Sequence, residues 1–409
     1  MRYANWAACL LGAAIAGTSP AASADINTEW DATACDVIGA AKPVTPLGVR
    51  TLAIAQTAAY EAVKRVLSGQ GASDASAEAA VAAAYRSALI ALAPAQQAMI
   101  DVAYRKSLDA LADSPATSAG IEIGERTAAE VLARRIGDGW STAESYRPVT
   151  SPGVYVPTAL PAVSQWTQRK PWLMTSAAQF RPGPPPALNS ARWARDYNEV
   201  KAMGAKNGSS RSAEQTDIAR FWEATLPSIY HGVVRSVAEQ PGRDVSRNAR
   251  LFAAVAQGMD DALIAVFDAK YHYNFWRPIT AIRNGDHDGN DATERDASWT
   301  PLIETPLHPE YPCAHCILSA TVGTILQADI GDSPIPALTT TSYLVAGSRR
   351  NWMTTEEFIE EVAEARICDG VHYRTSTEVA AAMGRKVGGL AVQRFFRLSD
   401  QRAEPAGQN

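Results

Sequence analysis

The feature that most constrains the fold is an alanine-rich stretch from Thr45 to Ala112. Ala, Leu, Val, Ile and Gln dominate it, and breaks at 68–71 and Pro94 divide it into segments of helical length. Similar helical signals return later in the chain, at 118–135, 190–203, 212–226 and 245–270. No region shows the sustained alternation with β-branched residues that marks strands. The sequence therefore predicts an all-α fold built as a helical bundle.

The stretch at 139–186 has a different composition, because prolines are interleaved there with Trp and Tyr. Prolines at this density prevent long helices, and disordered segments are poor in aromatic residues. We predict an ordered wrapping segment at 139–186. It would separate an N-terminal helical region at 25–138 from a helical bundle at 187–398, which carries the candidate site, and a polar tail follows at 399–409.

The first 24 residues resemble a signal peptide. Arg2 provides the positive start, an apolar run follows from Trp6 to Gly17, and Ala22-Ser23-Ala24 is typical of a cleavage site. The alternative is a buried N-terminal helix, and the run is too short for a membrane anchor of about 20 apolar residues. We expect an exported protein, periplasmic or extracellular, with no stable membrane anchor.

The charge and the cysteine count of the chain bear on its binding partners and on possible disulfides. The formal net charge of −5 argues against a general nucleic-acid binder, which needs concentrated Lys and Arg to contact phosphates. Loss of the first 24 residues would leave four cysteines, and an even number in an oxidising compartment permits disulfides without fixing their connectivity. These cysteines are Cys35, Cys313, Cys316 and Cys368.

The stretch KYHYNFWRP, residues 270–278, places two cations near the end of a predicted helix. Lys270 and Arg277 are almost two helical turns apart, so both side chains can project to one side, and Pro278 is expected to stop the helix. The alternative is that the cations only complement the helix dipole.

The stretch HPEYPCAHC, residues 308–316, is unusual because the chain has only six histidines. Pro312 suits the first position of a helix that would continue to Leu326. The backbone amides around Cys313, Ala314 and His315 would then be free donors at a helix N-terminus, which is a seat for an anion. A histidine in this position is more often a structural hydrogen-bond donor than a catalyst.

The stretch RICDGVHYR, residues 366–374, contains Arg366 and His372. Six residues place them on different faces of a straight helix, but Asp369-Gly370 indicates a turn that lets both reach one centre. Taken together, the three stretches describe a site for an oxyanion. Guanidinium groups and amides bind its oxygens, and imidazoles can attack phosphorus, ligate a metal or move protons.

In order and spacing, these stretches resemble the three-part signature of the vanadium-dependent haloperoxidases and the type 2 phosphatidic-acid phosphatases. That signature reads Lys, six residues, Arg-Pro; then Pro-Ser-Gly-His; then Arg, five residues, His. The stretches PPPALNSARWARDYNEVKAMG and RSAEQTDIARFW also resemble secreted bacterial haloperoxidase-like proteins, so the likeness extends from about Pro184 to Phe396. The resemblance implies a helical bundle of the haloperoxidase and acid-phosphatase type.

The resemblance also implies a role for each residue. The cations Lys270, Arg277 and Arg366 would neutralise vanadate or phosphate, with Cys313 and the amide of Ala314 beside them. His315 would be the acid–base histidine. His372 would bind vanadium, or attack phosphorus when the same cradle holds phosphate.

The sequence departs from the signature at several positions. Cys313 replaces the usual serine and Ala314 the usual glycine, and a free thiol that touches peroxide is open to oxidation. The phosphatase pattern expects Ser before Arg366 and Asp four residues after His372, where this chain has Ala365 and Ser376. The acid that orients His372 is therefore left open among Asp369, Glu378 and a distant residue.

Three functions follow from this resemblance. The leading hypothesis is a haloperoxidase that uses vanadate and hydrogen peroxide to oxidise a halide, with a small organic substrate. The alternative is a periplasmic acid phosphatase that needs no cofactor, acts on a phosphate ester and passes through a phosphohistidine at His372. The third is a non-catalytic, disulfide-locked relative.

The resemblance also bears on the cysteines, because Arg366 would bring Cys368 near the same cradle. We expect a Cys316–Cys368 disulfide that fastens the anion-binding helix to the Arg366 segment. The rival pairing is Cys313–Cys368, which would favour the non-catalytic relative.

Overall fold

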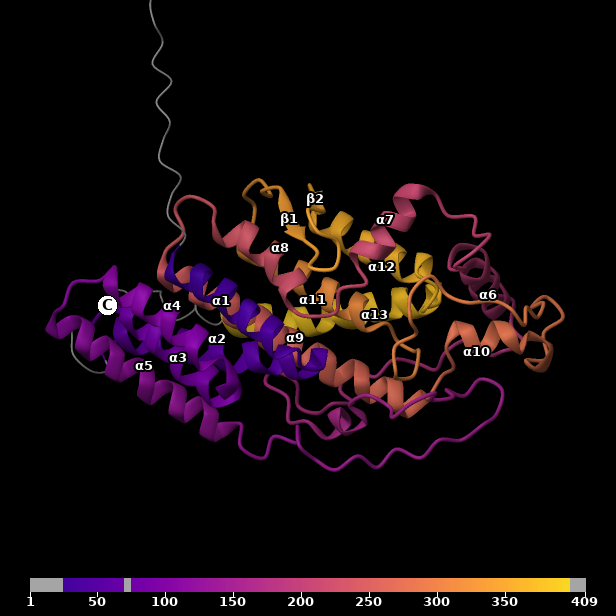
Figure 1. Ribbon diagram of the computed structural model, residues 1–409, viewed down its shortest axis with the longest axis horizontal. Coiled ribbons are helices and arrows are strands. Elements are labelled where there is room, and N and C mark those ends of the chain that lie inside the picture. The colour runs from indigo at the N-terminus through magenta and orange to yellow at the C-terminus, as the bar shows by residue number, and fades with distance from the viewer. Residues whose placement is uncertain (1–24, 70–74, 398–409) are drawn as a thin grey trace, which may run out of the picture.

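The computed structural model describes residues 25–69 and 75–397, which are predominantly helical (Figure 1). The predicted signal peptide at 1–24 and the predicted polar tail at 399–409 lie outside the described residues. The α-helices are α1 Ile26–Ala41, α2 Thr45–Leu67, α3 Ala77–Leu92, α4 Gln97–Asp109, α5 Pro115–Arg134, α6 Ala191–Met203, α7 Ala213–Phe221, α8 Ser228–Ala238, α9 Val245–Tyr273, α10 Pro278–Arg283, α11 Ala314–Ile330, α12 Thr355–Cys368 and α13 Arg374–Val392. Short helical turns are η1 Pro94–Gln96, η2 Ser164–Gln168, η3 Gly285–His287 and η4 Gln393–Arg397, and the strands are β1 Leu338–Thr341 and β2 Arg349–Trp352.

The alanine-rich stretch forms consecutive helices, as predicted. Helix α2 ends at Leu67 and η1 begins at Pro94, so both predicted breaks fall between helices. The buried alanines permit close packing, and a Cβ added to Gly124 of α5 would lie 2.4 Å from the Ala80 carbonyl oxygen of α3. Helices α1, α2, α3 and α5 share one buried apolar cluster.

Helix α9 runs through the middle of the molecule and joins this N-terminal part to the rest (Figure 1). Its Ala249 and Ala256 belong to the N-terminal cluster, whereas most of its apolar residues belong to a second cluster with α8, α11, α12 and α13. Every residue of α9 from Leu251 to Lys270 is buried, as expected of a helix that is surrounded by protein. Because α9 ends at the candidate site, its burial fixes one side of that site.

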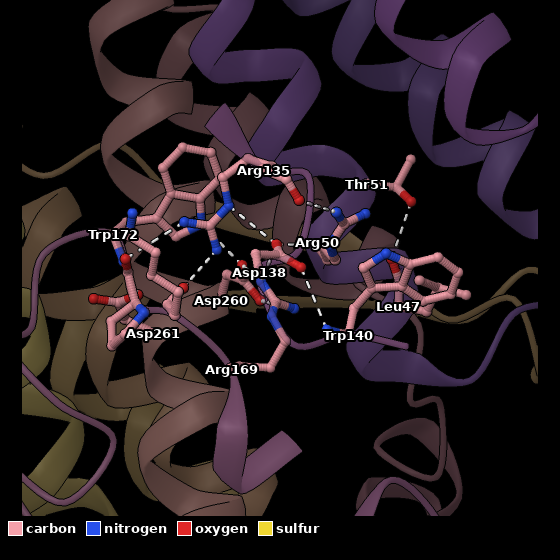
Figure 2. Close-up of polar contacts among 12 residues, drawn as sticks. Leu47, Arg50, Thr51, Arg135, Asp138, Trp140, Arg169, Trp172, Asp260 and Asp261 are labelled. Atoms are coloured by element: carbon pink, nitrogen blue, oxygen red, sulfur yellow. Dashed lines mark hydrogen bonds and ion pairs between the residues drawn. The ribbon is translucent and has the colours of Figure 1, made fainter. Parts of the chain in front are cut away.

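The wrapping segment contains no long helix, as its prolines predict, and η2 is its one short helical turn. Figure 2 shows how buried charges hold the segment against α9. The guanidinium of Arg169 lies 2.8 Å from Asp260 and 3.2 Å from Asp138. The carboxylate of Asp261 accepts hydrogen bonds from the backbone amides of Trp172 and its two successors, at 2.7–2.8 Å.

Several elements differ from the sequence-based expectation. No separate helix was predicted for α1, α8, α10, α12 or α13, although α1 lies in the predicted N-terminal helical region and the others in the predicted helical bundle. The antiparallel hairpin that pairs Leu338 with Trp352 was not predicted either. Ser212 caps α7 in a capping box, in agreement with its sequence pattern. Among the residues that the structure describes, no helix has both the length and the apolar character needed to cross a membrane.

Candidate functional site

The three stretches that carry the candidate residues meet at one place in the fold. Lys270 lies near the end of α9, the N-terminus of α11 contributes Cys313 to His315, and the turn between α12 and α13 contributes His372. Gly370 makes this turn possible, since its φ of +84° favours glycine and a Cβ there would lie 2.5 Å from the Gly204 carbonyl oxygen. The convergence that the sequence suggested is therefore present.

Lys270 is fully buried and its ammonium group is held by backbone oxygens. It donates to the carbonyl oxygens of Glu310 at 2.7 Å and Pro309 at 3.0 Å. Burial lowers the pKa of Lys270 well below its usual value, and the nearby Arg277 lowers it further. A negative ligand close to this group would favour its charged form.

Arg277 reaches the site from beyond the end of α9. The expectation that Pro278 stops a helix containing Arg277 is wrong, because α9 ends at Tyr273 and Pro278 opens α10 instead. Its guanidinium donates to the carbonyl oxygens of His308 and Val371 at 2.9 and 2.8 Å. Burial lowers the pKa of Arg277 to about 10, so the negative charge around this guanidinium does not fully offset the cost of burying it.

Arg366 lies in the last turn of α12 and has one carboxylate partner. It forms an ion pair of 2.7 Å with Asp369 and donates to the Trp222 carbonyl oxygen at 3.0 Å. Its Nε is buried and has no hydrogen-bond partner within the protein. Burial raises the pKa of Asp369 to about 7, although Arg366 opposes the shift.

His372 is oriented by Glu310, a residue that the sequence did not identify. Its Nδ1 lies 2.6 Å from the Glu310 carboxylate, and its Nε2 lies 3.3 Å from the Arg277 guanidinium. Because a guanidinium can only donate, Nε2 carries the lone pair and the proton lies on Nδ1. Burial lowers the pKa of His372 well below its usual value, so the imidazole is neutral with Nε2 available as a ligand or nucleophile.

Neither Asp369 nor Glu378, the two local acids proposed from the sequence, contacts the Nδ1 of His372. Asp369 pairs with Arg366, and Glu378 forms an exposed ion pair with Arg192. Glu310 is the distant acid, and burial raises its pKa to about 7. Its position inside HPEYPCAHC was the sequence feature that could have identified Glu310 as the partner of His372, since an acid next to a candidate site can orient an imidazole.

The N-terminus of α11 forms another wall of the site. The helix begins at Ala314 with Cys313 as its N-cap, two residues later than Pro312 suggested. The amides of Ala314 and His315 lie in the first helical turn, where no intrahelical acceptor exists. His315 donates from Nε2 to the Ala224 carbonyl oxygen at 3.2 Å, which leaves its Nδ1 as an acceptor. Burial lowers the pKa of His315 well below its usual value.

The expected Cys316–Cys368 disulfide is contradicted, and so is the rival Cys313–Cys368 pairing. All four described cysteines are free, and the sulfur of Cys316 lies 2.8 Å from that of Cys313. Cys368 instead contacts Glu364 on its own helix at 3.6 Å. The physical reason is helix geometry, because residues two apart, such as Arg366 and Cys368, do not share a face of α12.

A cavity of about 310 Å³ adjoins these residues. Ala314, His315, Arg366, His308 and His372 contribute its polar end. The rest of its lining is mostly apolar, with Thr45 and Thr225 as the polar members, and includes Pro43, Val44, Pro46, Ala162, Val163, Leu263, Phe267, Pro306, Leu307 and Leu318. A small ligand in this cavity would therefore contact both histidines and an apolar surface.

The donor set fits an oxyanion better than a metal cation. Three buried cations, Lys270, Arg277 and Arg366, share the site with Glu310 and Asp369, whose raised pKa values reduce their compensating charge. The orphaned Nε of Arg366 and the free amides of α11 are donors without acceptors. Vanadate and phosphate supply such acceptors, so the residues present fit either group.

Outside these stretches, Asp31, Cys35 and His231 place their ligand atoms within 4.8 Å of one another. Arg235 already forms an ion pair of 2.6 Å with Asp31, and His231 Nδ1 lies 2.6 Å from the same carboxylate. The carboxylate is thereby satisfied by a cation of the protein.

Comparison with known proteins gives a consistent result. Residues 250–401 match the VCPO second helical-bundle domain. Over 181 residues the chain is 27% identical to the vanadium chloroperoxidase of Curvularia inaequalis, and this match covers 36% of the chain but only 29% of that relative's length.

Two solved structures resemble most of the chain. The first bacterial vanadium-dependent iodoperoxidase matches with a TM-score of 0.75 and 23% identity over 90% of this chain and 96% of that one. An apo-type bacterial vanadium-dependent chloroperoxidase matches with a TM-score of 0.69 and 18% identity over 87% and 94% of the two chains. These likenesses confirm the predicted helical fold.

Proposed function

The chain belongs to the vanadium haloperoxidase family, and on that premise we propose that it oxidises a halide with hydrogen peroxide, using bound vanadate. The observation that carries the proposal is the surplus of buried positive charge around the lone-pair nitrogen of His372. A buried charge without compensation is costly, and an oxyanion would supply that compensation.

Each residue of the site has a distinct part in this proposal. Lys270, Arg277 and Arg366 would bind the vanadate oxygens, and His372 would ligate vanadium through Nε2. When bound, vanadate supplies a Lewis-acidic centre that activates peroxide for transfer of oxygen to a halide.

The other groups of the chain prepare this centre. Glu310 fixes the tautomer of His372 by accepting from Nδ1. Burial lowers the pKa of His315, which favours its neutral form, and its Nε2 lies 3.2 Å from the Ala224 carbonyl oxygen, so the imidazole would act as the base that takes a proton from an incoming peroxide. The apolar wall of Leu263, Phe267 and Leu318 limits the water around the reacting groups.

Reconstitution tests the proposal. Protein loaded with vanadate should consume peroxide in a halide-dependent manner, and protein without vanadate should not. His372→Ala should lose bound vanadium, whereas His315→Ala should keep it and turn over about 10²–10⁴ times more slowly. Vanadium bound equally well by His372→Ala would refute the assignment of the ligand.

The Glu310 contact with His372 supports a second candidate, a phosphatase that forms a phosphohistidine. A nucleophilic imidazole needs a partner that holds its proton on the far nitrogen, and Glu310 is placed 2.6 Å from Nδ1. Hydrolysis of a phosphate ester by the vanadate-free protein, with labelled phosphate retained on His372, would favour this candidate.

Export is part of the proposal, on the signal-like pattern of the first 24 residues. Expression of the full sequence in a Gram-negative host should give a periplasmic protein that begins near Asp25. A cytoplasmic product with an intact N-terminus would contradict this.

A further inference from the structure

Cys313 and Cys316 form a close pair of thiols at the start of α11. They are spaced as C-x-x-C, both are fully buried, and the thiol of Cys316 donates to the sulfur of Cys313 at 2.8 Å. Both sulfurs are free, as are those of Cys35 and Cys368, which lie on other helices. Within residues 25–69 and 75–397, Cys313 and Cys316 are therefore the two thiols that lie close enough to react with each other.

The two thiols have different surroundings, which separates their roles. Cys313 is the N-cap of α11 and its sulfur accepts from the Cys316 amide at 3.4 Å, at the end of a helix that favours negative charge. Burial raises the pKa of Cys313, but the Cys316 hydrogen bond and the charges of Arg366 and Lys270 outweigh it and hold that pKa below its usual value. Burial and the neighbouring Cys313 raise the pKa of Cys316 well above its usual value.

These features match what a reactive cysteine and its resolving partner require. The thiolate is the nucleophile in thiol chemistry, and a helix N-terminus with nearby cations stabilises it. Oxidation of Cys313 removes the neighbouring thiolate that helps to raise the pKa of Cys316, so the second sulfur can lose its proton as it attacks.

The cavity of the candidate site adjoins the start of α11, although the side chains of Cys313 and Cys316 are themselves fully buried. Ala314 and His315, the two residues that follow Cys313, line that cavity together with Arg366. An oxidant as small as hydrogen peroxide that enters the cavity therefore arrives at the N-terminus of α11.

We propose that Cys313 and Cys316 are a peroxide-oxidised dithiol, in which Cys313 is the reacting thiol and Cys316 closes the disulfide. The Cys313 thiolate attacks one oxygen of hydrogen peroxide, an S–O bond forms as the O–O bond breaks, and the departing hydroxide takes a proton to become water. The Cys316 sulfur then attacks the sulfenic sulfur of Cys313. The S–S bond forms, the S–O bond breaks and a second water leaves with the Cys316 proton.

The balance is two thiols and one hydrogen peroxide giving one disulfide and two waters, with two electrons passing from sulfur to oxygen. Neither vanadate nor halide takes part. The proposal for the dithiol can therefore be tested independently of the proposed haloperoxidase activity.

The experiment uses the full chain, reduced, freed of reductant and of vanadate, and exposed to a small excess of hydrogen peroxide. Free thiols are then alkylated and the chain is cleaved with trypsin. Residues 296–349 contain no internal Lys or Arg and hold Cys313 and Cys316 without any other cysteine, so both report in one peptide. We expect that peptide to lose two hydrogens and both alkylation sites, and to regain the sites after reduction.

Two variants assign the roles, with the remaining cysteines as internal controls. In Cys316→Ser, a 1,3-diketone such as dimedone should label Cys313 as its sulfenic acid. In Cys313→Ser, Cys316 should remain reduced and alkylatable. The peptides of Cys35 and Cys368 should stay alkylated throughout.

Three results would overturn the proposal. The first is that Cys313 and Cys316 stay reduced at a peroxide concentration that oxidises free cysteine. The second is that Cys35 or Cys368 is oxidised at the same rate. The third is that the 296–349 peptide of the wild-type protein gains oxygen without forming a disulfide.

Discussion

Helix α9 contributes to two buried clusters of charge, and they are built differently. The anchor network holds Arg50, Arg135 and Arg169 against Asp138 and Asp260, beside Asp261, which accepts from backbone amides. The cradle holds Lys270, Arg277 and Arg366 with only Glu310 and Asp369. In the first cluster every cation pairs with a carboxylate, whereas among the described residues of the second only Arg366 does.

The pairing within each cluster shows the same difference. In the network, Asp138 lies 3.0–3.2 Å from three guanidinium groups, and Arg169 bridges it to Asp260 (Figure 2). In the cradle, Arg366–Asp369 is the one carboxylate ion pair formed by these three cations within the described residues, since Lys270 and Arg277 donate to backbone oxygens and to histidines. The network pairs its own charges and fastens the wrapping segment, whereas the cradle leaves two basic groups without a carboxylate partner, which the proposed oxyanion would supply.

The largest effect is expected on stability, from breaking the anchor network. Arg169→Ala leaves Asp138 and Asp260 buried with less compensation, and should lower the free energy of unfolding by about 3–5 kcal/mol in urea denaturation. Arg134→Ala is the matched control, because its ion pair with Glu61 is largely exposed and should matter little. Equal losses in the two variants would remove the distinction between the network and a surface pair.

The corresponding change in the cradle should act on ligand binding. Arg366→Ala removes a buried cation whose Nε has no hydrogen-bond partner in the protein, which should weaken phosphate binding by about 2–5 kcal/mol. The measurement is the increase in the free energy of unfolding that phosphate causes, which should be smaller in the variant. Arg277→Ala should behave alike. Arg385→Ala, which loses only an exposed pair with Glu356, should leave phosphate binding as it is.

A smaller effect should come from Glu310, which acts on the ligand through His372. Glu310→Gln keeps the shape but weakens the hold on Nδ1–H, and should lower vanadate affinity roughly 10–100-fold. Glu378→Gln alters an exposed acid that does not contact His372 and serves as the control. If both substitutions have the same effect, Glu310 does not orient the imidazole.

The smallest effect concerns pH. Below about pH 7, Glu310 and Asp369 are protonated and the cradle cations lack their compensation, so anions bind best there. As pH rises through about 7 both carboxyls ionise, compensate the cations and weaken anion binding. Sulfate keeps a constant charge over this range, so its affinity should fall as pH rises; an affinity that rises instead would contradict the shifted pKa values.

Local signals in the sequence were enough for most of the helices and for the residues of the cradle. Alanine-rich runs and breaks gave α2 to α5, and the spacings in three stretches gave Lys270, Arg277, Arg366 and both histidines. Helix α8 was missed because it is short and rich in Val and Ile, residues with weak helical propensity.

The parts that could not be predicted depend on contacts between distant residues. Glu310 and His372 are separated by 62 positions, and nothing local in the sequence pairs them. The network joins α2, the end of α5, the wrapping segment and α9. Because its residues come from distant segments, no local sequence pattern distinguishes them from surface charges. The expected Cys316–Cys368 disulfide failed for a related reason, because being near Arg366 in sequence did not place Cys368 on the same face of α12.

The most direct test of the account is a calorimetric titration of vanadate into the wild-type protein and into Arg366→Ala and Arg385→Ala. We expect saturable binding of one vanadate per chain that phosphate displaces, with the affinity unchanged in Arg385→Ala and weakened by about 2–5 kcal/mol in Arg366→Ala. Absence of saturable binding in the wild-type protein, or equal affinity in all three, would contradict the claim that the buried cations form an oxyanion site.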